Sequence, residues 1–169
     1  MALDFEVGAP FPAFDFPAVV WHSDRHGDRC ARGLVSNESL RARAFVLWVY
    51  PKAATSGCTL EAREFAAIHG ELQSAGVEVI GLSRDSVNAL WKFIQAQEIP
   101  FSLASDAGGA WMGRHGLIEA RTMYGKPVTK VLRTTFLVDG DRVLRHIWER
   151  VTPAGHGAQV LAEVKALAG

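Results

Sequence analysis

The chain has 169 residues, and its 18 basic and 18 acidic side chains give a formal net charge of zero. A chain of this length is expected to form one domain, 1–169, that buries a substantial core without disulfides. The charge balance predicts no partnership with nucleic acid or with an anionic membrane. No apolar run approaches the ~20 residues that a membrane-spanning helix needs, and the acidic start predicts no secretory signal. Two cysteines fit a reducing compartment, so we expect a soluble cytoplasmic protein.

The beginning of the chain is predicted to be irregular over residues 8–43. Pro10, Pro12 and Pro17 interrupt any regular pattern there, and the polar stretch 22–29 follows them. Clusters of proline and polar residues of this kind are typical of loops.

A near-continuous apolar run at 44–50 predicts the first strand, of the kind that is buried in a covered sheet. A helix with one apolar face is expected to follow from about 59 to 75, with Gly76 as its stop. This junction between strand and helix is the most informative part of the chain.

Strands and helices alternate in the rest of the sequence. The predicted elements are a strand at 77–82, a helix at 87–97 with Ser83, Asp85 and Ser86 as capping candidates, a short strand at 101–104, a short helix at 107–115, a hairpin of strands at 131–138 and 142–148 around a turn at 139–141, and a final helix at 157–168. This order predicts an α/β fold with a mixed central sheet flanked by helices, as in thioredoxin-like proteins.

Cys58 lies at the junction between the first strand and its helix, within Thr55-Ser56-Gly57-Cys58-Thr59. A cysteine in the first turn of a helix meets unpaired backbone N–H groups and the positive end of the helix dipole. Both favour the thiolate, which is the nucleophilic form. We therefore predict a reactive cysteine, against the alternative of a small buried core residue.

Three residues near Cys58 bear on its chemistry. Pro51 ends the strand and fixes a turn, and Gly57 allows close backbone approach. Thr55 lies three residues before the cysteine, so its hydroxyl can fold back towards the sulfur or a substrate, or can merely cap the turn.

The pattern Pro51-x-x-x-Thr55-x-x-Cys58 resembles the active-site signature of peroxiredoxins. Segments at 49–52, 57–61, 81–86, 123–126 and 133–137 resemble the peroxiredoxin Q branch, also called bacterioferritin comigratory protein. The resemblance extends from about residue 42 to the C-terminus. It implies a thiol-dependent peroxidase of thioredoxin-like fold that acts in antioxidant defence, with a catalytic set of Cys58, Thr55, Arg133 and Pro51. No cofactor and no metal are expected.

The chemistry of peroxide reduction fits these residues. The Cys58 thiolate attacks one peroxide oxygen and becomes a sulfenic acid. A cation at Arg133 favours the thiolate and can donate to the peroxide oxygens. The Thr55 hydroxyl and the Cys58 N–H can stabilise charge in the transition state, where each donor is typically worth ~3 kcal/mol. The expected substrates are hydrogen peroxide and small organic hydroperoxides.

Other interpretations of these positions remain open. Outside its Arg-Thr-Thr-Phe-Leu segment, Arg133 would be read as a surface charge at a strand edge. Glu61 is read as a first-turn acid that the helix dipole favours, without a catalytic role. Ser56 departs from the family, which commonly has proline there, but no catalytic atom is lost.

The resemblance also bears on the second cysteine. Two-cysteine members of the branch carry a resolving cysteine five residues after the reactive one or on the next helix, and those positions hold Arg63 and residues near Ile94. Cys30 lies outside the matched region and is interpreted as a bystander, unless it resolves by an unusual route. A one-cysteine mechanism is predicted, in which thioredoxin or a low-molecular-weight thiol is the external reductant, and the protein is expected to be a monomer or weak dimer.

His22, His26 and Cys30 are spaced by four residues, which could suggest a metal site. No fourth ligand is evident nearby, and structural zinc normally takes four. These residues are therefore read as parts of a solvated loop.

Three other functions compete with the peroxidase. A disulfide oxidoreductase needs Cys-x-x-Cys, whereas Cys58 is followed by Thr59, Leu60 and Glu61. A cysteine hydrolase needs a histidine base beside the cysteine, and the sequence does not indicate one. A non-catalytic redox sensor or chaperone is the main alternative, and sustained peroxide consumption with a reductant distinguishes the two.

Overall fold

A mixed sheet forms the centre of the computed structural model, which describes residues 5–24, 27–40 and 43–168. Within those ranges the sheet has seven strands in the order β2-β1-β5-β4-β3-β8-β9. Their bounds are β1 Asp15–Asp24, β2 Gly27–Ser36, β3 Ala44–Val49, β4 Val77–Ser83, β5 Ser102–Ser105, β8 Thr134–Val138 and β9 Leu144–Trp148. Strand β4 pairs parallel with β3 and β5, and the other pairings are antiparallel.

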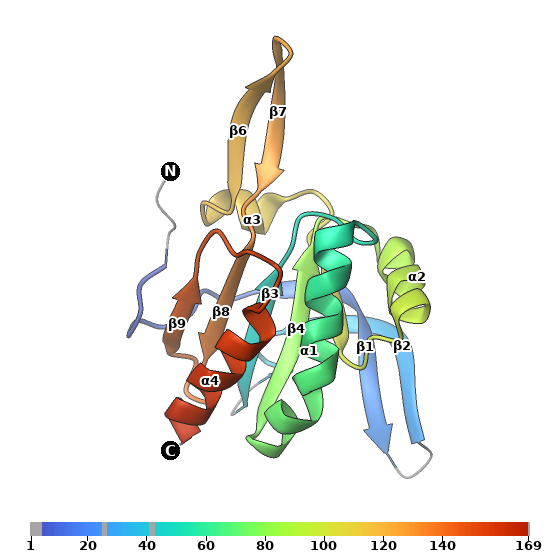
Figure 1. Cartoon of the computed structure of the whole chain (residues 1–169), viewed down its shortest axis with the longest axis vertical. Coiled ribbons are helices and arrows are strands. Elements are labelled where there is room, and N and C mark those ends of the chain that lie inside the picture. The colour runs from blue at the N-terminus through green and yellow to red at the C-terminus, as the bar shows by residue number, and fades with distance from the viewer. Residues whose placement is uncertain (1–4, 25–26, 41–42, 169) are drawn as a thin grey trace.

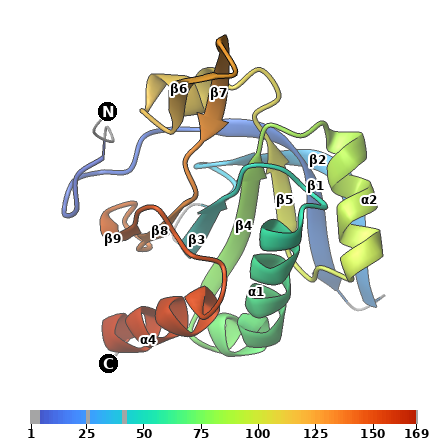
Figure 2. The same cartoon turned by 45° about the horizontal axis from the view of Figure 1, so that its top comes forward.

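Helices cover the sheet on both faces. Helices α1 (Ser56–Ser74), α2 (Val87–Gln97) and α4 (His156–Ala168) lie on one face (Figures 1 and 2). Their apolar sides pack with the inward residues of β3 and β4 in one core cluster that includes Trp48. The short helix α3 (Ala110–Arg114) packs on the opposite face, in a second cluster rich in phenylalanine. Because β3 lies between the two clusters, its apolar residues are buried on both sides, which explains their unbroken run.

The prediction of an irregular region over residues 8–43 was wrong for residues 15–24 and 27–36. Strands β1 and β2 form a long hairpin there, and β1 joins the sheet through β5 at Ala18 and Val19. Pro17 is tolerated because it lies just before the residues that pair with β5, where its missing N–H is not needed. The charged residues of β2 fit an edge strand, which natural sheets protect with charges.

A second hairpin, formed by β6 (Ile118–Met123) and β7 (Lys126–Val131), interrupts the strand that we predicted at 131–138. Val131 ends β7, and Thr134 begins β8. The hairpin stands out from the same end of the molecule at which α1 begins (Figure 1). Its turn has positive φ at both central positions, 51° at Tyr124 and 75° at Gly125, as two-residue hairpin turns require.

The other predicted elements are confirmed with small shifts in their ends. Helix α2 has the predicted bounds, and Ser86 caps it by accepting a hydrogen bond from the Ala89 N–H. Helix α1 begins at Ser56, three residues before the predicted start. None of the helices in the described ranges combines the length and apolar character that a bilayer crossing requires.

Gly81 in β4 provides a test of how tightly the core below Cys58 is packed. A Cβ atom at this position would lie 2.5 Å from Leu103 Cδ2 and 3.0 Å from Trp48 Cε3. We expect Gly81→Ala to lower the free energy of unfolding by ~1–3 kcal/mol, the usual cost of overpacking. Urea denaturation measures the change. Gly108→Ala is the matched control, since a Cβ there meets nothing within 4 Å, and equal stability of the two variants would contradict this packing.

Candidate active site

The candidate site lies at the carboxyl end of β3, where residues 51–55 lead into α1 (Figure 1). Cys58 is the third residue of the helix, and its side chain is fully buried in the core cluster below α1. The first hydrogen bond of the helix joins the Thr59 N–H to the Thr55 carbonyl at 2.9 Å. The backbone N–H of Cys58 therefore precedes the helical ladder, which leaves it suited to an anion near the sulfur.

Asp85 fixes the loop before the helix. Its Oδ2 accepts hydrogen bonds from the Ala53 N–H at 2.7 Å and from the Ser83 hydroxyl at 2.8 Å. The next residue, Ala54, has a left-handed backbone with φ of 65°. The sequence suggested Asp85 as a cap for α2, but its carboxylate holds the loop next to Cys58 instead.

Thr55 and Pro51 lie at the two ends of this loop. The Thr55 hydroxyl donates to the Lys52 carbonyl at 2.8 Å, and its side chain is exposed. With its proton used in this bond, the oxygen offers lone pairs to an approaching donor. Pro51 is half-buried between the strand and the loop.

Arg133 reaches Cys58 from the segment between β7 and β8. Its guanidinium forms an ion pair with the Glu61 carboxylate and lies against the start of α1, beside Gly57 and Cys58. Burial alone would lower the pKa of Arg133, but Glu61 and then Cys58 outweigh it, so the pKa is raised and the cation is retained. The structure thus brings Arg133 and Cys58 together, although they are 75 positions apart along the chain.

Glu61 is the residue that sequence reasoning underestimated. Because α1 begins at Ser56, Glu61 lies beyond the first turn, so the dipole interpretation was wrong. Its side chain is fully buried, and burial raises its pKa, although Trp48 and Arg133 act in the opposite direction. The three-residue spacing from Cys58, which places both on one helix face, was the signal available in the sequence.

Gly57 allows Arg133 to lie close to the start of α1. A Cβ at this position would be 3.2 Å from Arg133 Nη2 and 3.3 Å from Pro153 Cγ. The absence of a side chain here therefore creates the space for the guanidinium beside Cys58.

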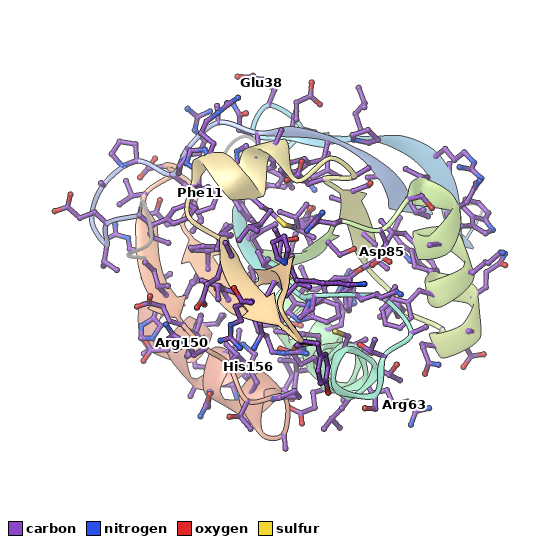
Figure 3. All side chains as sticks on the ribbon, turned by 90° about the horizontal axis from the view of Figure 1, so that it is seen from above. Phe11, Glu38, Arg63, Asp85, Arg150 and His156 are labelled. Carbon is purple, nitrogen blue, oxygen red and sulfur yellow. The ribbon has the colours of Figure 1, made fainter. Side chains whose placement is uncertain are left out.

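A second set of contacts joins α1 to α4 near the site. Glu64 accepts hydrogen bonds from the backbone N–H groups of Gly155 and Gly157, at 2.9 and 2.8 Å. His156 is buried, and its Nε2 lies 2.8 Å from Thr135 Oγ1 on β8. Figure 3 shows His156 lying inward, whereas Arg63 points outward from α1. No ligand or triad spacing in the sequence indicated these contacts.

The other sulfur is remote from this site. Cys30 lies in β2 opposite Trp21, and β1, β5 and β4 separate β2 from β3. Cys58 lies in α1, which packs over β4, and three strand spacings of ~4.8 Å between β2 and β4 give a lateral separation of roughly 14 Å. The predicted solvated loop around Cys30 is wrong, since Cys30 lies in β2 and His22 in β1, while His26 lies outside the described residues. Among the side chains that the structure describes, no three histidine, cysteine, aspartate or glutamate residues form a possible metal site.

A mixed sheet of this order, with a buried cysteine at the start of a helix and an arginine beside it, has the architecture of thioredoxin-like thiol enzymes. A family model described as the AhpC/TSA family matches residues 7–147, and the chain belongs to this family.

Named relatives define the branch. Peroxiredoxin Bcp of Xanthomonas campestris is 39% identical over 131 residues, which cover 76% of this chain and 82% of the relative. Peroxiredoxin Bcp of Escherichia coli is 28% identical over 154 residues, with 91% and 92% covered. These matches place the chain in the Bcp, or peroxiredoxin Q, branch and make it a thiol peroxidase that uses a peroxide and a thiol reductant.

Solved structures agree with this assignment. Peroxiredoxin Q of Xanthomonas campestris superposes with a TM-score of 0.80 at 31% identity and 92% coverage of both chains. The fold is therefore thioredoxin-like, as the sequence predicted. The bacterioferritin comigratory protein of that organism, whose structure is described for its alkyl peroxide reduction activity, also gives a TM-score of 0.80, with 31% identity and 92% coverage of both chains. Further structures of peroxiredoxin Q carry serine in place of one or the other of two cysteines.

His156 leads to a prediction for stability against pH. Its pKa is lowered from its usual value near 6.5, chiefly by burial, so below that pH the unfolded chain binds a proton that the folded chain does not. Its contribution to stability is therefore present above pH ~6.5 and is lost as the pH falls towards the lowered value. We expect the stability advantage of wild type over His156→Gln to shrink between about pH 8 and about pH 5.5.

Urea denaturation of both proteins across that pH range measures the effect. His146→Gln, which removes an imidazole from the adjacent strand β9, is the matched control. A constant difference between wild type and His156→Gln at every pH would refute the assignment of a buried neutral imidazole.

Proposed function

We propose that the chain reduces hydrogen peroxide and small organic hydroperoxides at Cys58, by a one-cysteine mechanism in which an external thiol reduces the sulfenic acid. The observation that carries the proposal is the buried Cys58 at the start of α1 in contact with Arg133. The alkyl peroxide reduction activity of the Xanthomonas relative supports the inclusion of organic hydroperoxides.

Each candidate residue has a distinct role in the first step. The Cys58 thiolate attacks one peroxide oxygen, the O–O bond breaks, and the second oxygen leaves as hydroxide or alkoxide and takes up a proton. Arg133 and the Cys58 N–H donate to the oxygens as charge develops on them. Thr55 accepts a hydrogen bond from the peroxide, because its own hydroxyl proton is donated to the Lys52 backbone carbonyl. Pro51 fixes the turn with which the loop begins.

The second step requires a change in structure. The sulfenic acid forms on a side chain that is fully buried, and a mixed disulfide needs more space there than a peroxide does, so the first turn of α1 opens in this step. The Asp85 bonds hold the loop up to Ala53, which places the opening after that residue.

The single-cysteine assignment rests on the residues at the two usual positions of a resolving cysteine and on the separation of Cys30 from Cys58. Two cysteines were substituted in the Xanthomonas relative. The residue that lies at the same spacing after Cys58 in this chain is Ile94, a buried apolar residue in α2. Arg63, five residues after Cys58, is exposed. Cys30 lies beyond the ~7 Å that a disulfide allows between Cα atoms, because about three strand spacings separate β2 from the strand below α1. We further propose that the protein acts in antioxidant defence in the cytoplasm as a monomer or weak dimer, with thioredoxin or a small thiol as its reductant.

Arg133→Ala tests the first step. Removal of the cation and its donors should slow peroxide reduction by ~10²–10³-fold, as loss of one good transition-state donor does. Stopped-flow oxidation by hydrogen peroxide measures the rate, with Cys58→Ser as the inactive baseline. Arg121→Ala, on the exposed β6, is the matched control. Wild-type turnover in Cys58→Ser would refute the proposed function, and an unchanged rate in Arg133→Ala would remove the arginine from the mechanism.

Cys30→Ser tests the one-cysteine mechanism. We expect thiol-supported turnover to remain near the wild-type rate, because Cys30 is too distant to form a disulfide with Cys58. One equivalent of peroxide should leave a sulfenic acid that dimedone traps, and excess peroxide should oxidise it further. Mass spectrometry identifies the product. A Cys30–Cys58 disulfide together with stalled turnover of Cys30→Ser would overturn the mechanism.

A further inference from the structure

A cavity of about 390 Å³ lies beside the start of the active-site loop. Its wall includes Pro51 and Lys52 of the loop, Arg84 and Asp85 after β4, and Thr129 and Lys130 of β7. These segments meet at the end of the molecule that Figure 3 looks down on, where Asp85 is labelled. The cavity is distinct from the reacting centre, because Thr55, Cys58 and Arg133 do not line it.

The charges around this cavity are unbalanced in favour of cations. Lys52, Arg84 and Lys130 face one carboxylate, that of Asp85. Oδ2 of that carboxylate already accepts from Ala53 and Ser83.

Among the described side chains, these three cations have no ion-pair partner. The ion pairs of the described side chains include neither lysine and do not include Arg84. Arg84 donates one hydrogen bond, from Nη1 to Thr129 Oγ1 at 3.1 Å, and its remaining N–H groups are available. Two exposed ammonium groups and a guanidinium around a hollow are suited to a carboxylate ligand.

The position of the cavity indicates the stage at which such a ligand acts. It shares Pro51 and Lys52 with the active-site loop, and the Lys52 carbonyl holds the hydroxyl of Thr55. A peroxide reacts with the sulfur in the closed site, beside Thr55 and Arg133. Neither of these residues lines the cavity. A reductant meets Cys58 after α1 has opened, and a thiol held against Lys52 is then next to the segment that opens.

We propose that this cavity binds the carboxylate of a small acidic thiol, which is the reductant of the Cys58 sulfenic acid; this rests on the one-cysteine function proposed above. The thiol sulfur attacks the sulfenic sulfur, a mixed disulfide forms, and the sulfenic oxygen leaves as water with the thiol proton. A second thiol molecule attacks the sulfur of the bound thiol, which releases a small disulfide and restores the Cys58 thiol. Two thiols are oxidised for each peroxide that is reduced to an alcohol or water.

The test compares initial rates with mercaptosuccinate, which is acidic, and with the neutral 2-mercaptoethanol, at a hydrogen peroxide concentration below that which inactivates the protein. We expect Lys130→Gln to lower kcat/KM for mercaptosuccinate by about two- to fivefold, the effect of one exposed charge pair, and to leave that for 2-mercaptoethanol unchanged. Lys130→Glu should lower it further, Lys130→Arg should restore it, and about 0.5 M salt should reduce the wild-type preference. The control is Lys126→Gln, a lysine of the same strand that does not line the cavity.

Two further measurements separate the possible failures. If Lys130→Gln slows Cys58 oxidation by a carboxylate-bearing hydroperoxide but not by cumene hydroperoxide, and leaves the thiol preference unchanged, the cavity serves the peroxide and the proposal is wrong. An equal loss with both thiols, or an equal loss in Lys126→Gln, also refutes it. A Cys30–Cys58 disulfide after one peroxide equivalent refutes the one-cysteine function itself, whereas a trapped sulfenic acid with no thiol preference refutes the cavity alone.

Discussion

The contact between Arg133 and Glu61 is the constraint on which the site depends. A cation beside Cys58 must be held in a largely buried place, where desolvation opposes its charge. Glu61 compensates for that cost, but it is buried itself, and Trp48 and the Arg133 guanidinium oppose the effect of burial on its carboxylate. Removal of either partner leaves the other group buried without its partner, so the two side chains depend on each other.

The elements that converge on this pair explain the arrangement of the fold. Glu61 comes from α1, Arg133 from the link between β7 and β8, and Gly57 leaves the space in which they meet. The Glu64 carboxylate one turn later ties α1 to the start of α4. The helix that carries Cys58 is therefore fixed firmly behind the cysteine, while its first turn has few such bonds and is free to respond to oxidation.

Much of the second half of the fold could be predicted, because its helices and strands follow regular apolar periods. The first hairpin could not, since Pro17 lies within β1 and the charges of β2 lie on an edge strand, so both resembled loop signals. At the site, the resemblance pointed to Cys58 and Arg133. The burial of Glu61 and the contact of His156 with Thr135 depend on segments far apart in sequence, which periodicity does not bring together. Asp85 was visible as a polar residue before a helix, yet only the tertiary structure shows that its carboxylate holds the loop.

The backbone of Ala54 has a consequence for the energetics of the loop. An L-residue with a side chain in the left-handed region carries a strain of roughly 1–2 kcal/mol, and Ala54 has it directly after the residue that Asp85 anchors. The strained residue thus lies between Ala53, whose N–H is bonded to Asp85, and the first turn of α1. The Asp85 bonds on one side and the start of α1 on the other therefore hold Ala54 in a conformation that this residue would not favour by itself.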